Sequence, residues 1–290
     1  MTHRRCLLRT TLFCLFIAYG LLCGGCASIL TSTVIQPAVG NLQRQQDVGL
    51  VCEGAPAYLL MIDSLIEAKQ SNRDLLLLGV QSYGGSIAAL ESCGAPADRL
   101  HALADKAKIY GRRLLVSLLS SEKDLASETE LDKALAALKP GDARDLFWSA
   151  YGWLAWIGQQ QGSPAAMADL VVVEQLMKRV IELDETVESG GAHLFFGILY
   201  GAKPALAGGD PERSRSHFQR ALELSGRSLL PVQTAYAQTY ARITFDQELH
   251  DTLLEEVLAF PLETAPENTL VNQIAKRKAR QLLADDYFGN

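Results

Sequence analysis

The segment Arg179-Val180-Ile181-Glu182-Leu183-Asp184 returns 41 residues later in a related form, as Arg220-Ala221-Leu222-Glu223-Leu224-Ser225. In this register the apolar positions follow an i, i+4, i+7, i+8 spacing, which is one face of an α-helix. The aligned positions are Val173, Met177, Val180 and Ile181 in the first copy and Ser214, Phe218, Ala221 and Leu222 in the second. A weaker third copy places Leu254, Val257 and Leu258 on the same face. A helical repeat of this length is typical of stacked helix pairs.

A helix of different character precedes each copy. One contains Trp148, Tyr151 and Gly152, and the other contains Phe196, Gly197 and Tyr200. A glycine allows two helices to approach closely, and an aromatic ring fills the groove between neighbours, so this combination resembles the tetratricopeptide (TPR) pattern. The spacing is longer than the standard 34 residues, so the units are TPR-like. A generic array of helical hairpins is the alternative.

Helical periodicity runs through the chain from Ala55 onward, and no convincing strand pattern interrupts it. Short breaks rich in Gly, Pro or polar residues separate the segments. The expected helices are 55–69, 71–92, 96–119, 128–138, 143–160, 168–183, 190–203, 211–224, 231–243, 247–259 and 266–286. The sequence therefore predicts an all-α fold of antiparallel helix pairs, stacked as a TPR-like superhelix.

The first 25 residues have the composition of a secretion signal. Three arginines precede an apolar run over 10–22, which is too short for a comfortable membrane span. Small residues then lead to Cys26, as at a bacterial lipoprotein cleavage site. We therefore expect a signal peptide over 1–25 and lipidation at Cys26. An ordinary signal peptide cut nearby, or an uncleaved anchor, is the alternative.

The rest of the chain divides into two parts. Residues 26–50 show little periodicity and are predicted to be a lipidated tether, and 51–290 to be one all-α TPR-like domain. Because Ala27 follows the cysteine, lipoprotein sorting predicts the periplasmic face of the outer membrane. The net charge of −6 becomes −9 when the three positive charges of the signal are removed, which argues against a nucleic-acid-binding protein.

Three of the six cysteines remain after processing, at Cys26, Cys52 and Cys93. With Cys26 lipidated, two thiols remain in an oxidising compartment. Cys52 precedes one expected helix and Cys93 follows the next, so an antiparallel hairpin would bring them together, and we predict a disulfide. Two separately buried thiols are the alternative. Neither Cys nor His has the spacing of a zinc site, so no metal site is predicted.

No catalytic signature occurs in the sequence, and the five histidines are scattered. The aromatic residues are more informative, because tryptophans and tyrosines recur on the first helix of successive pairs. We predict that they line a groove for an apolar ligand that carries an anion, or for a partner. The predicted groove residues are Trp148, Tyr151, Trp156, Tyr200, Lys203, Tyr236 and Tyr240. Packing in the core is the alternative for each of them.

A basic run, Lys276-Arg277-Lys278-Ala279-Arg280, stands out on the last expected helix of an acidic protein. A run of this kind would suit an acidic partner or membrane phosphates. The alternative, which we favour, is a solvated helix face that interacts with carbonyl groups at a helix C-terminus.

Blocks spread over nearly the whole mature chain resemble the T-component family of TRAP transporters (TatT). The blocks include Asp145-Leu146-Phe147-Trp148-Ser149-Ala150-Tyr151, Ala192-His193-Leu194-Phe195-Phe196-Gly197-Ile198-Leu199-Tyr200, Gly208-Gly209-Asp210-Pro211-Glu212 and Asn272-Gln273-Ile274-Ala275-Lys276-Arg277. The family usually shows an Arg before a loop proline where this chain has Lys203-Pro204. The resemblance implies an all-α lipoprotein of cryptic TPR units that forms a homotrimer and associates with a periplasmic substrate-binding P-component.

The resemblance also implies a function without catalysis and without a cofactor. We expect a lipoprotein accessory component of a TRAP-type transport system, with a small apolar or amphipathic organic molecule as a further ligand. A TPR scaffold lipoprotein for envelope assembly, which binds no small molecule, is the alternative, and an unrecognised hydrolase is a second one.

Overall fold

The computed structural model describes residues 36–119, 121–160, 162–202 and 209–289. Within these ranges all regular elements are helical and no strand occurs, which confirms the predicted all-α class. The α-helices are α3 (Gln36–Gln43), α4 (Val48–Ala68), α5 (Arg73–Ser92), α6 (Ala97–Leu119), α7 (Glu128–Ala136), α8 (Ala143–Gln159), α9 (Pro164–Asp184), α10 (Gly191–Gly201), α11 (Pro211–Leu224), α12 (Pro231–Tyr236), α13 (Gln247–Ala259) and α14 (Thr269–Ala284). Short 3-10 turns lie between them at η2 (Glu122–Leu125), η3 (Pro140–Asp142), η4 (Val187–Ser189), η7 (Leu262–Thr264) and η8 (Pro266–Asn268), and a π turn, η6 (Ala237–Ala241), continues α12.

Polar side chains begin several helices where the sequence predicts them. The Asn72 side chain accepts a hydrogen bond from the Leu75 amide and caps α5. Asp210 likewise caps α11 through the Arg213 amide, with Pro211 in the first turn. Each cap satisfies an amide that has no partner within its own helix.

Helical structure starts earlier than the sequence predicts. The segment 26–50, predicted to be a tether, contains α3 and the start of α4, which Asp47 caps through the Leu50 amide. Pro56 lies inside α4, whereas the expected helix over 55–69 would have it in the first turn. The glycines and the proline lower the helix propensity of this stretch. Burial of Val48 and Val51 on α4 supplies the tertiary contacts that a propensity argument misses.

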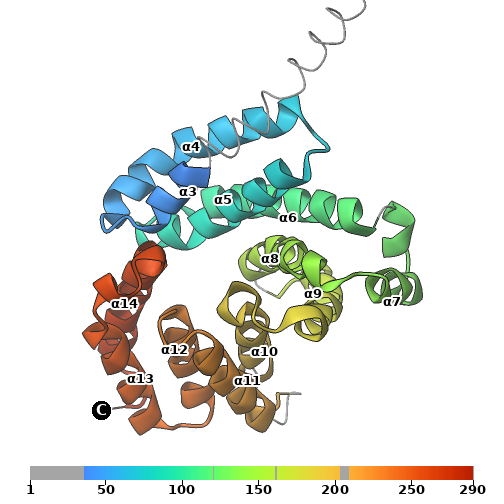
Figure 1. Ribbon diagram of the computed structural model, residues 1–290. Coiled ribbons are helices and arrows are strands. Elements are labelled where there is room, and N and C mark those ends of the chain that lie inside the picture. Colours follow the sequence, from blue (N-terminus) through green and yellow to red (C-terminus); the bar gives the residue numbers. More distant parts are fainter. Residues whose placement is uncertain (1–35, 120, 161, 203–208, 290) are drawn as a thin grey trace, which may run out of the picture.

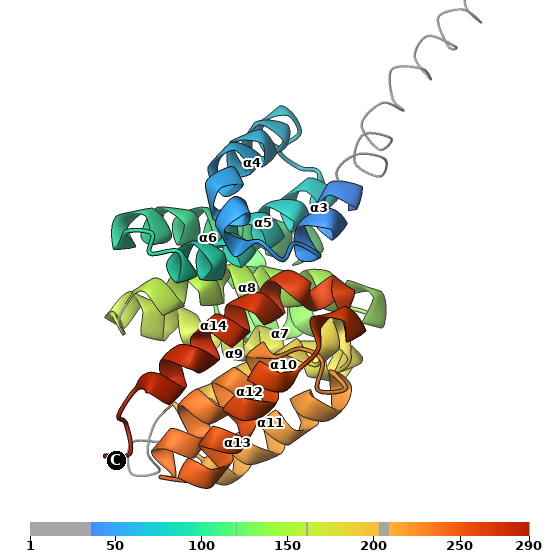
Figure 2. The same ribbon diagram turned by 90° about the vertical axis from the view of Figure 1, so that its left-hand side faces the viewer.

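The helix pairs follow an arc that closes on itself (Figure 1). From α4 to α14 each helix packs against the next, except that α6 packs directly on α8 while α7 contacts α9, and α14 then packs against α3, α4 and α5. Figure 2 shows α14 crossing in front of α8, α10 and α12 in the turned view. The C-terminal helix therefore joins the last pair to the first.

The repeated apolar face predicted from the sequence is the face that packs. Val173, Met177 and Val180 of α9 are buried in one core cluster. Phe218 and Ala221 of α11 are buried in the next, together with Leu254 and Val257 of α13. The residues that repeat in the sequence therefore bury equivalent faces of successive second helices.

The tightest crossing in the structure is between α6 and α8. A methyl group added to Gly152 would lie 2.4 Å from the Ala107 carbonyl oxygen, and one added to Gly111 would lie 2.7 Å from the Ser149 carbonyl oxygen. Real Cβ atoms do not come so close to backbone atoms, so glycine is required at both positions. This contact sets the distance between α6 and α8.

A disulfide joins Cys52 and Cys93, whose Cα atoms are 6.7 Å apart. Cys52 lies in the second turn of α4 rather than before the helix, and Cys93 directly follows α5. Because α4 and α5 form an antiparallel hairpin, the start of one lies beside the end of the other. The bridge fastens the open end of this hairpin.

Candidate functional site

Three aromatic rings of α8 form one contact group near the start of α10. The Trp148 ring meets Tyr151 edge-on at 5.0 Å between centroids and meets Phe147 edge-on at 5.5 Å. Trp148 and Tyr151 are half-buried, whereas Phe147 is buried. The structure thus brings together two of the predicted groove residues, neither of which is fully buried.

A turn in an unusual conformation faces Trp148. The Trp148 indole Nε1 donates a hydrogen bond of 2.7 Å to Glu188 Oε1, and Arg144 Nε donates one of 3.2 Å to the same oxygen. Glu188 and Ser189 have φ values of 47° and 56°, and Gly190 has 83°. Left-handed residues other than glycine are strained and cluster at sites where surrounding contacts hold them. The turn before α10 therefore holds a carboxylate against Trp148.

The ring of Tyr151 lies on α5. A methyl group added to Gly84 would be 2.8 Å from Tyr151 Cε1, so the absence of a side chain at Gly84 makes room for the ring. Burial raises the pKa of the Tyr151 phenol.

Tyr200 of α10 belongs to a second group of rings. Its ring stacks on Phe196 at 5.7 Å and lies 5.7 Å from His217. The Arg213 guanidinium lies 3.9 Å from the centre of the Tyr200 ring and also donates a hydrogen bond to the phenol oxygen. A cation over an aromatic face is a favourable pair, and here it leaves an exposed arginine beside an aromatic surface.

A chain of polar groups runs beneath this stack. The two Nδ1 atoms of His193 and His217 are 2.9 Å apart, and His193 Nε2 is 3.1 Å from Glu185 Oε2. With both rings neutral, His217 donates to His193, and His193 donates to Glu185. Burial lowers the pKa of His217 to about 4, and the neighbouring His193 adds to the shift. Burial also lowers the pKa of His193.

Trp156 lies elsewhere on α8, so it does not join the ring group of Trp148 and Tyr151. Its Nε1 donates a hydrogen bond of 2.9 Å to Asp105 of α6, and the Lys108 ammonium lies 3.4 Å from the centre of an indole ring. Lys108 also forms an ion pair with Asp169 of α9. Trp156 therefore ties α8 to α6, and Lys108 ties α6 to α9, on another part of the molecule.

Tyr236 and Tyr240, also predicted to line the groove, are core residues. Both are buried, Tyr236 stacks on Phe218 at 4.6 Å, and Tyr240 lies 5.3 Å from Tyr236. Both tyrosines therefore pack in the core, because Tyr236 of α12 packs on α11 and Tyr240 of η6 packs on Tyr236. Lys203 and Cys26 lie outside the described residues.

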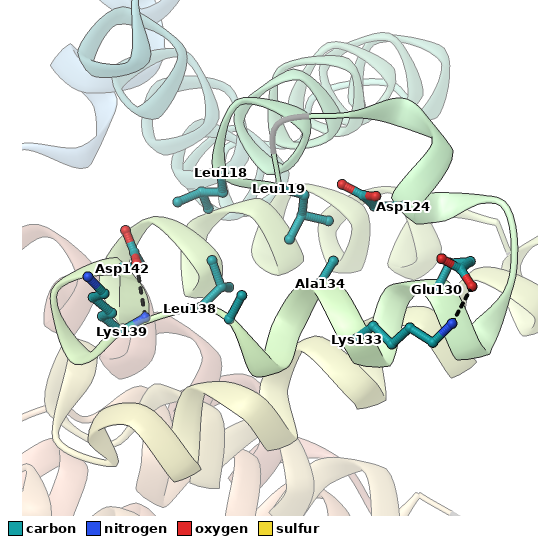
Figure 3. Close-up of a pocket in the computed structure, with 10 residues that line it drawn as sticks. Leu118, Leu119, Asp124, Glu130, Lys133, Ala134, Leu138, Lys139 and Asp142 are labelled. Carbon is teal, nitrogen blue, oxygen red and sulfur yellow. Dashed lines mark hydrogen bonds and ion pairs between the residues drawn. The ribbon is translucent and has the colours of Figure 1, made fainter.

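A pocket of 510 Å³ opens between the end of α6 and α7, with an apolar floor and charged ends (Figure 3). Leu118, Leu119, Ala134 and Leu138 form the floor. The pairs Glu130–Lys133 and Lys139–Asp142 stand at the two ends, and a hydrogen bond joins each pair. None of the predicted groove residues lines this pocket, nor a second one of 410 Å³ beside Ile109, Arg112 and Arg113.

The basic run on α14 is partly structural. Lys276 Nζ donates hydrogen bonds to the carbonyl oxygens of Leu258 and Phe260, at 3.0 and 2.6 Å. These carbonyls end α13, so the lysine satisfies groups that lack partners within that helix. Burial lowers the pKa of Lys276, and the positive charge of Arg280 adds to the shift. Lys278 and Arg280 are exposed.

Comparison with known protein families identifies the family to which this chain belongs. The family model for the TRAP transporter T-component matches residues 44–288. This chain belongs to the TRAP transporter T-component family. It is also 22% identical over 312 residues to an uncharacterized protein of Treponema pallidum (strain Nichols), an alignment that covers 95% of this chain and 97% of the relative.

Membership of the T-component family indicates a part in TRAP transport and a periplasmic or membrane-associated location. Among the described residues of this family member, α4 has the length and hydropathy of a candidate membrane span, with 28% of its apolar window buried. The same residues include no group of three or more His, Cys, Asp or Glu side chains arranged to hold a metal ion.

Sequence reasoning missed Glu188 and the His193–His217 pair in this T-component. The two histidines are 24 positions apart and meet because α10 and α11 pack side by side. Glu188 reaches Trp148 from 40 positions away through a left-handed turn. The adjoining Gly190-Gly191 was the available signal, since a methyl group on Gly191 would lie 2.6 Å from the Phe147 ring.

Proposed function

We propose that this chain is a non-catalytic lipoprotein accessory component of a TRAP-type transport system and that it binds the periplasmic substrate-binding P-component. The observation that carries the proposal is the T-component family match, which covers almost all described residues, from just before α4 to the C-terminal tail. A closed array of helix pairs supports it, because such arrays present large rigid surfaces to protein partners.

The anchor and the assembly belong to the same proposal. Lipidation at Cys26 would hold the protein at the periplasmic face of a bacterial membrane, with the outer membrane as the expected one. We expect a homotrimer. The absence of a recognisable catalytic motif in the sequence supports a role without catalysis.

The ligand in this proposal is a small apolar or amphipathic organic molecule, held at the partly buried rings of Trp148 and Tyr151, with the separate ring group around Tyr200 as a second candidate surface. Two arginines stand beside these rings, since Arg144 shares Glu188 with Trp148 and Arg213 lies against Tyr200. Guanidinium groups bind carboxylates through paired hydrogen bonds. The combination suits an organic anion.

The structure offers a matched comparison for this site. Trp148 and Trp156 lie on the same helix and both are half-buried, but Trp156 is bound to Asp105 and Lys108, away from the Trp148 group. With the aromatic anion 1-anilinonaphthalene-8-sulfonate as probe, Trp148→Ala should weaken fluorescence-detected binding at least fivefold. Trp156→Ala should leave it within twofold. Equal loss in both variants, or a loss of helicity by circular dichroism in Trp148→Ala, would count against the site.

The partner is tested with residues 27–290 as bait in periplasmic extract of the organism of origin, with bound proteins and small molecules identified by mass spectrometry. The proposal expects a TRAP substrate-binding protein as the main enriched partner. Enrichment of envelope-assembly proteins without one would favour the alternative, a TPR scaffold lipoprotein.

A further inference from the structure

An exposed aromatic patch lies where the C-terminal tail folds back on the end of the α12–η6 helix. We define it by Phe245, Tyr287 and Phe288. The Phe245 ring is 6.0 Å from Tyr287 and 6.3 Å from Phe288, and the last two rings are 5.1 Å apart. The side chain of Phe245 is 72% exposed and that of Tyr287 is 40% exposed. Clustered exposed aromatics are uncommon on a protein surface and mark interaction sites.

Phe245 stands in a position that the backbone would give to glycine. Its φ is 56°, and the Asp246 amide bonds to the Ala241 carbonyl oxygen at 2.8 Å, as at a helix end closed by a left-handed residue. A bulky residue is strained there. The fold gains little in return, because most of the Phe245 ring is in solvent. A strained residue with little burial indicates a role outside the fold.

The patch is held rigidly from below. The Arg242 guanidinium lies 4.5 Å from the centre of the Tyr287 ring and pairs with Asp285 at 2.9 Å. The Tyr287 hydroxyl donates to the Arg242 carbonyl oxygen at 3.3 Å, and Phe288 packs edge-on against buried His250. Because these contacts fix the C-terminal tail, binding a partner here would cost little conformational entropy.

The rim of the patch is acidic. Asp246 and Glu248 are exposed directly after Phe245, Asp251 follows His250, and Asp285 and Asp286 precede Tyr287. Arg242, the positively charged residue beneath the patch, is largely buried and forms an ion pair with Asp285. The patch therefore fits a partner with an apolar pocket and basic residues around it.

Two other occupants fit this surface poorly. A contact that buries this patch against the same patch of a second copy would bring the two acidic rims together, with like charges opposed. A contact with a different face of a second copy, as in a trimer, is tested by the light-scattering measurement below. A membrane is disfavoured by the same acidic residues and by position. The lipid expected at Cys26 precedes α3 in the chain, and α3 contacts η8 just before α14 starts. The patch follows the other end of α14, roughly 24 Å away at the rise of an α-helix.

We infer that this aromatic patch is the docking surface for the P-component, whose facing surface would be apolar at its centre and basic at its edge. This inference rests on the proposed function. In it, Phe245 is an anchor that enters the partner's pocket, and the acidic rim speeds and orients the encounter.

The variant Phe245→Gly separates binding from folding. Glycine adopts a positive φ without strain, so the variant should melt at the same temperature as the wild type or higher. Its Kd for the purified P-component of the same organism, measured by surface plasmon resonance with residues 27–290 immobilised, should rise at least tenfold. Leu60→Ala is the matched control, because Leu60 is 68% exposed and belongs to α4, which lies across the molecule from the C-terminus in Figure 1. The Kd of this variant should stay within twofold of the wild-type value.

The salt dependence tests the rim. Wild-type affinity should fall at least tenfold between 50 and 500 mM NaCl, and Glu248→Gln should reduce that dependence. If the wild type binds the P-component and Phe245→Gly binds it with the same Kd, the patch is not the docking surface. The proposed function would then still stand. A change in oligomeric mass of Phe245→Gly in light scattering would instead make a second copy the occupant and overturn the inference. No binding by the wild type would contradict the proposed function itself.

Discussion

Arg220 and Glu256 occupy equivalent places on successive second helices and make the same contact with opposite charges. Arg220 of α11 donates two hydrogen bonds, at 3.1 and 2.5 Å, to Glu185 in the turn that ends α9. Glu256 of α13 accepts one of 2.7 Å from Arg227 in the turn that ends α11. Each ion pair ties a second helix to the end of the second helix before it.

Arg179 makes the corresponding contact one unit earlier. It donates hydrogen bonds of 3.0 Å to the carbonyl oxygens of Leu135 and Leu138 at the end of α7. The repeat in the sequence thus marks a recurring tie between units, and the partner changes from backbone to carboxylate to guanidinium. A repeat protein is stabilised mainly by such contacts between neighbours.

The first prediction concerns the sign of the Arg220–Glu185 pair. Arg220→Glu should lower the melting temperature, because Glu223 and Glu185 would then face a third carboxylate. Adding Glu185→Arg recreates the pair in the arrangement that Glu256 and Arg227 already have, so the double variant should recover most of the loss. Differential scanning calorimetry of the two single variants and the double variant measures the coupling. Additive losses would mean that the two charges act independently.

The second prediction concerns the crossing of α6 and α8. Gly152→Ala should destabilise the protein by about 1–3 kcal/mol, because the new methyl group meets backbone atoms that cannot move aside alone. Gly158→Ala on the same helix has open space around it and should stabilise the protein by about 0.5–1 kcal/mol. Urea unfolding followed by circular dichroism gives both values. Equal effects would show that the crossing is loose.

The third prediction concerns the disulfide. Cys52 and Cys93 are separated by 41 residues, and closing a loop of this length is expected to add about 3–4 kcal/mol to the free energy of unfolding. Reduction should therefore lower the urea midpoint. Thiol labelling of residues 27–290, unfolded without reductant, should find no free thiol. Two reactive thiols per chain would contradict the bridge.

The fourth prediction concerns pH. His217 has a pKa of about 4 in the folded protein and about 6.5 when unfolded, so the unfolded chain binds the proton more tightly. The folded protein should therefore lose stability as pH falls from about 6.5 toward 4, and this loss should be absent above that window. His217→Gln should lose less stability than the wild type between pH 7.5 and pH 5, as measured by urea midpoints. Parallel losses in both proteins would show that His217 is not responsible.

Local signals explain which parts of the fold could be predicted. Caps such as Asn72 and Asp210 act within one turn, so the sequence fixes where α5 and α11 begin. The disulfide follows from a hairpin whose connection is short. The start of α4 depends instead on burial of Val48 against other helices, and its glycines and proline point the other way.

The candidate site shows what spacing along one helix leaves undetermined. Trp148 and Trp156 are eight residues apart and so lie on similar sides of α8, but about 12 Å apart along its axis. Over that distance the neighbours change from Glu188 to Asp105 and Lys108. Analogy with other first helices predicts a groove position for Tyr236 and Tyr240, whereas in the core Tyr236 stacks on Phe218 of α11 and Tyr240 packs on Tyr236.

The most direct test of the account is isothermal titration calorimetry of residues 27–290 with the purified P-component of the same organism. The proposed function predicts a saturable heat signal with a simple fixed stoichiometry, which weakens as salt increases. The absence of any binding heat at concentrations up to about 100 μM, with both proteins folded by circular dichroism, would contradict it.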